Sequence, residues 1–434
     1  MKIGVFAQYI NTRNDIRDLI TEMNRKGDII LLLNERDKSL ADLLGPEIEI
    51  RFFNSKKYKY RNYFFEKLFL LFGKLPVSKN NYYITENFKL YNAGLTGFFY
   101  YFERGLLSLS KITMKFINYK KYLSFLKTGQ GSLLEGIDKF FCITQIYNDA
   151  MYAAIQKTGK PVINYVYSWD HACKMKCFLN DKQNTYLTWS EAIRDDVHEL
   201  QGIEYDNIHV LGATQLIYLS DYLRQQELKH SVKKYIYMVG GTGNGILLKE
   251  EVAMMKEIIK TIRKSSGISI KIRPYPFTKA MNVYDQLLSF PDVEIENMQS
   301  FEAGKSRLPA DYEMKYDTIS GAFAFFHFGT TLSLEAAYLN VPVILLDIAH
   351  EKNFTQLNGF IHQYQNDKYL NVAGSPNVLC TISELNQLLK RLETPEVFLN
   401  YNNALKKVGQ VESMDEVIDR LMKEINNAAG CIIN

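Results

Sequence analysis

The sequence has few of the residues that build a disulfide-stapled or secreted protein. Only 5 of its 434 residues are cysteines, and this odd number is scattered along the chain. A disulfide framework is therefore not expected, and a reducing cytosol is the expected compartment. A signal peptide is not expected either, because the apolar run at residues 3–7 is short and four charged residues follow between positions 13 and 18.

Long apolar runs are also missing. The most apolar stretch, residues 94–109, contains Glu103 and Arg104 and falls short of the roughly 20 apolar residues that a spanning helix needs. We therefore expect no transmembrane helix. With 47% apolar and 23% charged residues the composition is that of a folded globular protein. At about 150 residues per domain, the length predicts two or three domains.

Several motifs of metal and nucleophilic chemistry are absent. The sequence contains no Asp-x-Asp of the kind that holds Mg²⁺ or Mn²⁺ on a nucleotide sugar, no Gly-x-Ser-x-Gly and no His-Glu-x-x-His. His171, Cys173 and Cys177 have a spacing that zinc could use, but no fourth ligand and no second cysteine pair accompany them. We expect neither a metal site nor a bound cofactor.

The net charge of +4 is small but unevenly distributed. Residues 55–128 hold 14 Lys or Arg against 3 Glu, a surplus of 11, which leaves the rest of the chain at −7. The same segment holds 20 of the 57 aromatic residues. It is either a helical insertion with internal aromatic packing and a solvated basic face, or a surface that docks on an anionic membrane. Nucleic acid is not an expected partner, because no recognised motif accompanies the charge.

Predicted strands and helices alternate in two blocks, which favours two doubly wound α/β domains. The first domain is expected at residues 1–218, with the helical insertion at about residues 55–130. Its strands are predicted at residues 2–7, 29–33, 139–143, 162–167, 185–189 and 208–211. Ser190 is predicted to cap the start of a helix that ends at Gly202.

The second domain is expected at residues 232–390. Its strands are predicted at residues 235–239, 268–272, 321–328 and 342–346. Residues 391–434 are mostly helical by pattern and are expected to pack back toward the first domain.

The best candidate for a ligand site follows the third strand predicted in the second domain. Gly329, Thr330, Thr331 and Ser333 are small residues at the start of a predicted helix, where free N–H groups and the helix dipole attract phosphate. Glu335 lies one turn beyond Thr331 on the same helix face, where it could accept hydrogen bonds from a ribose. The alternative is an ordinary helix start with a stabilising glutamate.

Three further groups of residues are candidates. The glycine-rich loop that contains Gly241 and Thr242 lacks a complete dinucleotide or P-loop motif, and predicts only a tight turn near a ligand or another domain. Arg273 ends a predicted strand, where it could bind phosphate or simply lie on the surface. Asp170 and His171 follow a strand of the first domain. Either could accept a proton from an alcohol, or they could be a capping carboxylate and a surface histidine.

Together these motifs resemble the GT-B glycosyltransferase superfamily, which has two Rossmann-like domains that face each other across a cleft. The resemblance rests on Gly-Thr-Thr-Leu-Ser-Leu-Glu-Ala-Ala at residues 329–337, followed by Asn-Val-Pro-Val at residues 340–343. Residues 168–170, 186–191 and 202–212 are similar to bacterial surface-polysaccharide transferases. The similarity covers residues 139–350, whereas residues 54–131 match nothing specific.

The resemblance implies a role for each candidate residue. Thr330, Thr331 and Ser333 would bind the phosphates of a nucleotide sugar, Glu335 its ribose, and Arg273 would assist the leaving group. CMP-sugar transferases tend to carry His-Pro where this chain has Arg273 and Pro274, so the donor nucleotide stays open among UDP, GDP and CMP.

The activity that the resemblance implies is transfer of a sugar to a glycan or lipid-linked acceptor. The missing Asp-x-Asp predicts that this transfer needs no metal. The expected location is the cytoplasm, either free or, if the basic segment docks, at the inner face of the cell membrane. Asp170 or His171 would be the general base. A nucleotide-sugar 2-epimerase on the same fold is an alternative, disfavoured because a small soluble substrate gives the basic insertion no role. A non-catalytic partner subunit is the other alternative.

Overall fold

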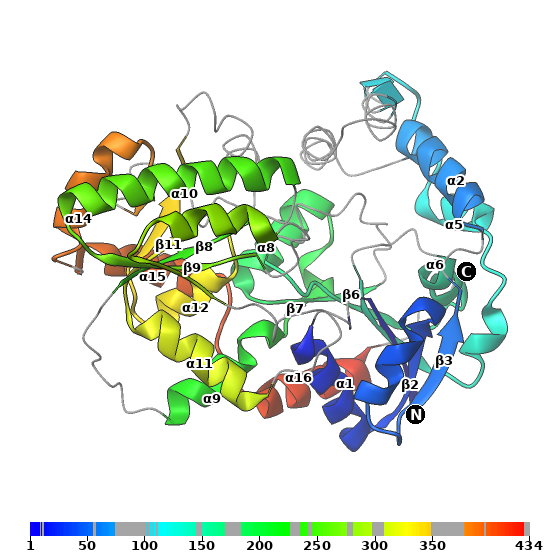
Figure 1. Ribbon diagram of the computed structural model, residues 1–434. Coiled ribbons are helices and arrows are strands. Elements are labelled where there is room, and N and C mark those ends of the chain that lie inside the picture. The colour runs from blue at the N-terminus through cyan, green and yellow to red at the C-terminus, as the bar shows by residue number, and fades with distance from the viewer. Residues whose placement is uncertain are drawn as a thin grey trace. The chain divides into compact units, whose positions relative to one another are not determined.

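The computed structural model describes two compact units, shown in Figure 1. The described residues are 1–54, 58–73, 112–144, 150–169, 184–225, 235–241, 245–275, 281–296, 308–348 and 377–428, apart from residues 9, 11, 12 and 395, with a few positions between 102 and 109. The first unit comprises Met1–Ile217 and Val411–Asn434, and the second Tyr218–Gln410.

The first unit is built on a parallel sheet of seven strands in the order β3-β2-β1-β4-β5-β6-β7. Its strands are β1 (Lys2–Ala7), β2 (Asp28–Asn34), β3 (Glu49–Phe53), β4 (Lys139–Ile143), β5 (Val162–Tyr165), β6 (Thr185–Thr188) and β7 (Ile208–Val210). The edge strand β3 is the one that the sequence pattern does not predict. Its residues are mostly half-buried, so it lacks the continuous apolar run of the inner strands.

Helices accompany this sheet as the alternation predicts. They are α1 (Asn14–Lys26), α2 (Lys59–Phe72), α5 (Tyr119–Phe125), α6 (Ala150–Lys157) and α8 (Glu191–Gln201). Both predicted caps of α8 are confirmed. The Ser190 hydroxyl accepts the N–H of Ile193 at 3.4 Å. Gly202 ends the helix with φ of 66°, a left-handed conformation that glycine adopts without a steric cost.

The last described helix, α16 (Met414–Asn427), belongs to the first unit and packs on α1. Lys26 forms an ion pair with Asp419, and the Lys139 ammonium donates to the carbonyl of Ile425 at 2.7 Å. The preceding helix, α15 (Glu396–Lys406), contacts α12 (Leu332–Tyr338) of the second unit. The C-terminal helices are thus divided between the two units.

The second unit has a parallel sheet of six strands in the order β10-β9-β8-β11-β12-β13. Its strands are β8 (Tyr235–Val239), β9 (Ser269–Arg273), β10 (Val293–Ile295), β11 (Ala322–His327), β12 (Val343–Leu346) and β13 (Val378–Leu379). The two edge strands have three and two residues, too short to produce a recognisable pattern in the sequence.

Helices cover both faces of the second sheet, as Figure 1 shows for α10 (Gly245–Ser265) and α11 (Pro309–Ser320). Ile236 and Met238 pack in the core on the face of α10 and α14 (Leu385–Arg391). The hydroxyl of Tyr235, which points the other way along β8, donates to Thr318 of α11 at 2.6 Å. The predicted class, two Rossmann-like α/β domains, is confirmed. Within the described residues, no helix is both long and apolar enough to cross a membrane.

Candidate functional site

The predicted donor loop connects β11 to α12 at the edge of the sheet where the parallel strands end. Gly329 has φ of 90°, a conformation that glycine favours, and a Cβ at this position would meet nothing within 4 Å. Gly329, Thr330 and Thr331 are half-buried, whereas Ser333 is buried. The glycine and both threonines of this loop are therefore partly exposed, as is Leu332.

His327, the last residue of β11, fixes the shape of this loop from inside. Its Nδ1 accepts the N–H groups of Gly329 at 3.1 Å and Thr330 at 3.4 Å. Burial lowers the pKa of His327 to about 3, so the ring is neutral. Because Nδ1 is the acceptor, Nε2 carries the proton, and no hydrogen-bond partner is found for it among the described residues. The sequence analysis assigned this histidine no role.

The loop satisfies several of its own polar groups. The Ser333 hydroxyl donates to the carbonyl of Thr330 at 2.7 Å, and the Leu332 N–H reaches the Thr330 hydroxyl oxygen at 3.4 Å. Two of its N–H groups are held by His327, as described above. Thr330 and Thr331 are half-buried whereas Ser333 is buried, so the two threonines are the more exposed of these three residues.

Glu335 lies in α12 and is almost completely buried. Its carboxylate is 2.7 Å from the ammonium of Lys315, which comes from α11 and is also buried. The Lys315 ammonium also lies 4.3 Å from the ring centre of Tyr316 and 5.2 Å from that of Tyr312. The carboxylate predicted to bind a ribose is thus part of a buried ion pair that no sequence motif indicates.

The glycine turn after β8 is held by a carboxylate from α10. Glu251 is fully buried, and it accepts the N–H of Gly241 and the hydroxyl of Tyr284, both at 2.8 Å. A Cβ on Gly241 would lie 3.0 Å from the carbonyl oxygen of Phe328. This turn therefore lies beside the β11 end that precedes the threonine loop, and its N–H at Gly241 is already bonded within the protein.

Arg273 ends β9 at the same edge of the sheet and is buried. Its Nη1 is 2.7 Å from a carboxylate oxygen of Glu296 and 3.5 Å from the hydroxyl of Tyr237. Burial raises the pKa of Tyr237 well above its usual value, so this hydroxyl stays protonated. The predicted phosphate-binding guanidinium therefore has a carboxylate partner of its own, again from outside any motif.

Three of the predicted site residues, Asp170, His171 and Thr242, lie outside the described residues. In the first unit, the described residues near the start of α1 instead include a cation that the sequence analysis missed. Arg13 holds Asp15 through two hydrogen bonds of 2.7 and 2.6 Å, and its guanidinium lies 5.3 Å from the centre of the Tyr167 ring. The sequence signal that could have indicated Arg13 is its position as a charged residue shortly after the first strand.

The described residues contain no group of three or more His, Cys, Asp or Glu side chains that could hold a metal ion. Cys173 and Cys177 lie outside them. The expectation of metal-independent chemistry stays a prediction.

No protein-family model and no curated protein sequence matches this chain. Solved structures do resemble it. A protein from Listeria monocytogenes assigned as a UDP-N-acetylglucosamine 2-epimerase is 8% identical, with a TM-score of 0.50 over 98% of this chain and 95% of that one. Anabaena HepE in complex with UDP is 8% identical, with a TM-score of 0.50 over 98% and 99%. The Neisseria meningitidis UDP-GlcNAc 2-epimerase bound to UDP-GlcNAc is 14% identical, with a TM-score of 0.49 over 98% and 100%.

At these identities the similarity is one of fold. The chain has the GT-B-like architecture of two Rossmann-like domains, as these proteins do.

Proposed function

We propose that this protein is a glycosyltransferase that moves a sugar from a nucleotide donor to a hydroxyl of a glycan or lipid-linked acceptor in bacterial surface-polysaccharide synthesis. The observation that carries the proposal is the second Rossmann-like unit, where the half-buried Thr330 and Thr331 follow β11 at the edge where the strands end. Ligands of open parallel sheets bind outside this edge. The UDP held by Anabaena HepE, a protein of the same fold, favours UDP as the donor nucleotide.

The reaction is a displacement at the anomeric carbon of the sugar. The acceptor oxygen forms a bond to that carbon while the bond to the nucleoside diphosphate breaks, and the acceptor proton passes to a base. We assign the base to Asp170 or His171. The threonine hydroxyls at 330 and 331 would donate to the departing phosphate, whose growing negative charge must be stabilised.

The predicted roles of two donor-binding residues have to be revised. Glu335 and Arg273 are each paired with an opposite charge, Lys315 and Glu296. Each ion pair carries almost no net charge. A bound ribose would therefore share Glu335 with Lys315, and a bound phosphate would share Arg273 with Glu296. We propose that Arg273 acts on the leaving group through this pair and that Glu335 contacts the ribose with its charge balanced by Lys315.

A nucleotide-sugar 2-epimerase is the second candidate. Its support is the Listeria monocytogenes protein assigned to that activity, which has the same fold over 98% of this chain. The two reactions differ in whether an acceptor is needed. A transferase releases nucleoside diphosphate only with an acceptor, whereas an epimerase inverts carbon 2 of the donor sugar without one.

Calorimetric titration of the full chain with UDP, GDP and CMP tests the shared part of the proposal. We expect UDP to bind most tightly. NMR of a UDP-sugar with and without acceptor glycans then separates the activities. Acceptor-dependent UDP release supports the transferase, a C2 epimer formed without acceptor supports the epimerase, and nucleotide binding without either product indicates a non-catalytic partner subunit.

The base is tested separately with Asp170→Asn and His171→Ala. If Asp170 takes the acceptor proton, Asp170→Asn abolishes turnover and leaves the UDP affinity unchanged. Loss of turnover in His171→Ala alone would move the role to His171, and full activity in both variants would place the base elsewhere.

A further inference from the structure

Part of the basic, aromatic segment packs internally. The rings of Phe69 in α2 and Tyr122 in α5 are stacked with their centres 4.4 Å apart, and both side chains are buried. Phe65 and Phe125 stack at 5.2 Å. The two helices thus form a packed pair, and these rings account for one share of the aromatic excess.

Polar contacts join the same pair near both of its ends. The Asn62 side chain donates to the carbonyl of Lys127 and accepts its N–H, both at 3.1 Å. The N–H groups of Phe116 and Ile117 both reach the carbonyl of Phe72 at 3.0 Å. These contacts fix α2 and α5 relative to each other, so the side chains that are not packed between them form the surface of the pair.

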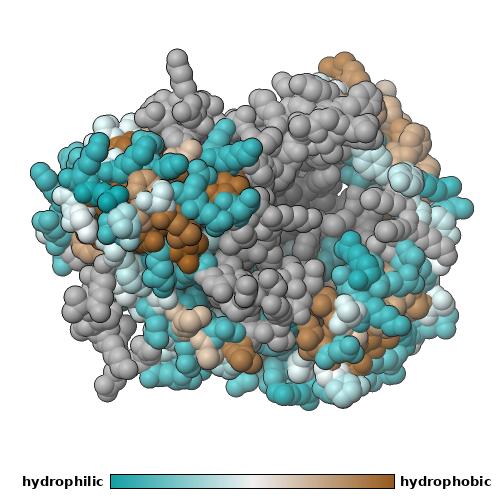
Figure 2. All heavy atoms as spheres, viewed as in Figure 1, coloured by the Kyte–Doolittle hydropathy of each residue, from teal (hydrophilic) through white to brown (hydrophobic). Residues whose placement is uncertain are grey.

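Other apolar side chains of the same basic, aromatic segment are exposed to solvent. Tyr60 is 88% exposed, Ile112 83% and Met114 80%, with Phe64 and Phe116 more than half exposed. Seven of the fourteen exposed large apolar residues in the described part of the chain lie between positions 60 and 116. Figure 2 shows such brown side chains at the surface over α2. Internal packing does not explain them.

The charges on this surface have one sign. Residues 58–73 and 112–128 contain seven Lys or Arg and a single acid, Glu66. That glutamate is buried and lies 3.5 Å from the ammonium of Lys67. Among the side chains described in these two ranges, the exposed charged ones are Arg61, Lys115, Lys120, Lys121 and Lys127. A partner must therefore offer both negative charge and an apolar interior.

We propose that α2, α5 and residues 112–116 form a docking surface for an anionic lipid bilayer. Arg61, Lys120 and Lys121 would lie among the anionic headgroups, which attract basic residues near the surface. Ile112 and Met114 would enter the apolar region, and aromatic rings such as Tyr60 are favoured at the interface. Aliphatic side chains give a membrane an advantage over nucleic acid, because they offer no ring to stack on bases. The proposal does not depend on the sugar chemistry.

Vesicle sedimentation of the full-length protein tests this surface. We expect binding to vesicles with 30% phosphatidylglycerol that weakens from about 0.01 to 0.15 M salt, as the Debye length falls from about 30 to 8 Å. Pure phosphatidylcholine vesicles should bind far less. Arg61→Gln, Lys120→Gln and Lys121→Gln together should weaken binding about a hundredfold at low salt, at about fivefold per charge.

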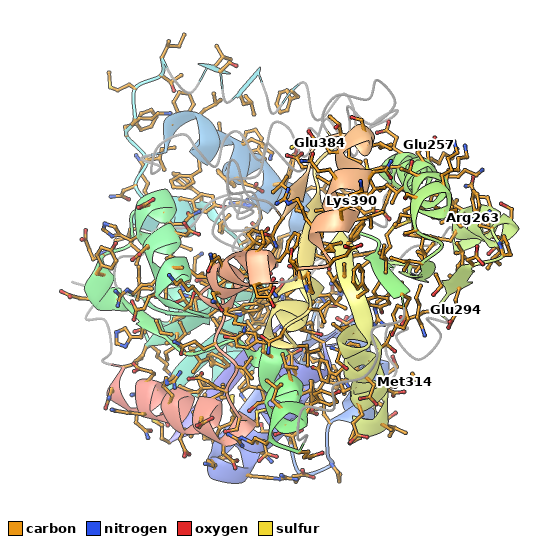
Figure 3. All side chains as sticks on the ribbon, turned by 90° about the vertical axis from the view of Figure 1, so that its left-hand side faces the viewer. Glu257, Arg263, Glu294, Met314, Glu384 and Lys390 are labelled. Carbon is orange, nitrogen blue, oxygen red and sulfur yellow. The ribbon has the colours of Figure 1, made fainter. Side chains whose placement is uncertain are left out.

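The apolar contribution is tested with Ile112→Ser and Met114→Ser, expected to weaken vesicle binding by about tenfold together. The matched control is Met314→Ser with Lys390→Gln, two exposed residues of the second unit labelled in Figure 3. This control should bind vesicles as the parent protein does. Circular dichroism and UDP affinity report fold and sugar-nucleotide function independently of lipid.

Three outcomes would overturn the proposal. One is no binding to anionic vesicles at any salt concentration, and another is equal, salt-insensitive binding to neutral and anionic vesicles. The third is a parent protein that is a dimer in sedimentation velocity and becomes monomeric in the Ile112→Ser, Met114→Ser variant, because the surface then covers a second copy of this chain.

Discussion

At the scale of single residues, the candidate site is dominated by charges that are paired inside the protein. Glu335 with Lys315 and Arg273 with Glu296 are buried ion pairs close to the end of the strands. Breaking such a pair leaves an uncompensated buried charge, whereas replacing both partners costs much less. Substitutions at these positions therefore report on stability as well as on ligand binding.

Glu335→Ala should lower the free energy of unfolding by about 3–5 kcal/mol, because Lys315 is left buried without its carboxylate. The double variant Glu335→Leu, Lys315→Met should recover most of this loss. Urea unfolding measures both. If Glu335 also contacts a ribose, the neutral variant Glu335→Gln weakens UDP binding by about 1.5–3 kcal/mol. Unchanged UDP affinity in this variant would argue against the ribose contact.

His327 should make the stability of the second unit depend on pH. Its pKa is lowered to about 3 in the folded protein, and its ordinary value is 6.5, so below pH 6.5 the unfolded chain binds a proton that the folded one does not. Its contribution to stability is complete above pH 6.5 and declines by about 1.4 kcal/mol per pH unit below it.

The measurement is urea unfolding at pH 6.5 and 5.0 for the parent and for His327→Gln, whose amide can accept the two loop N–H groups. We expect the parent to lose about 2 kcal/mol more than the variant over this interval. Equal losses would mean that His327 is protonated in the folded protein.

At the scale of elements, some aromatic rings of α2 and α5 are buried between the two helices, whereas others are exposed. Phe69→Ala removes a buried stacked ring and should cost about 3–4 kcal/mol of unfolding free energy. Phe64→Ala removes a ring that is 58% exposed and should change it by less than about 0.5 kcal/mol. Chemical denaturation measures the difference, and similar costs for both variants would contradict the division.

At the scale of the whole molecule, we expect the proposed transfer to need no metal. The sequence has no Asp-x-Asp, and hydroxyl donors and cations can stabilise a leaving diphosphate instead. We therefore expect UDP release to continue in excess EDTA. Loss of turnover that Mn²⁺ or Mg²⁺ restores would reveal a metal site that the sequence analysis missed.

The sequence determined the features that depend on neighbours along the chain. Strand β8 begins and ends at the predicted residues, and Ser190 and Gly202 cap α8 as expected. The doubly wound α/β class followed from the alternation, and the GT-B-like class from the resemblance carried by the motif after β11. These features could be predicted because hydrophobic period and capping chemistry are local properties. The short edge strands β10 and β13 were not predicted, because two or three residues are too few to show a hydrophobic period.

Only the tertiary structure decided which groups meet. Arg273 and Glu296 are 23 residues apart, and the Thr214 hydroxyl reaches Asp15, 199 residues away, at 2.7 Å. It also decided that Phe69 is buried and Tyr60 exposed, although both belong to one aromatic run. Such contacts depend on how elements pack rather than on spacing along the chain. The sequence therefore supplied the candidate residues, and packing determined which of them are paired, which are buried and which are exposed.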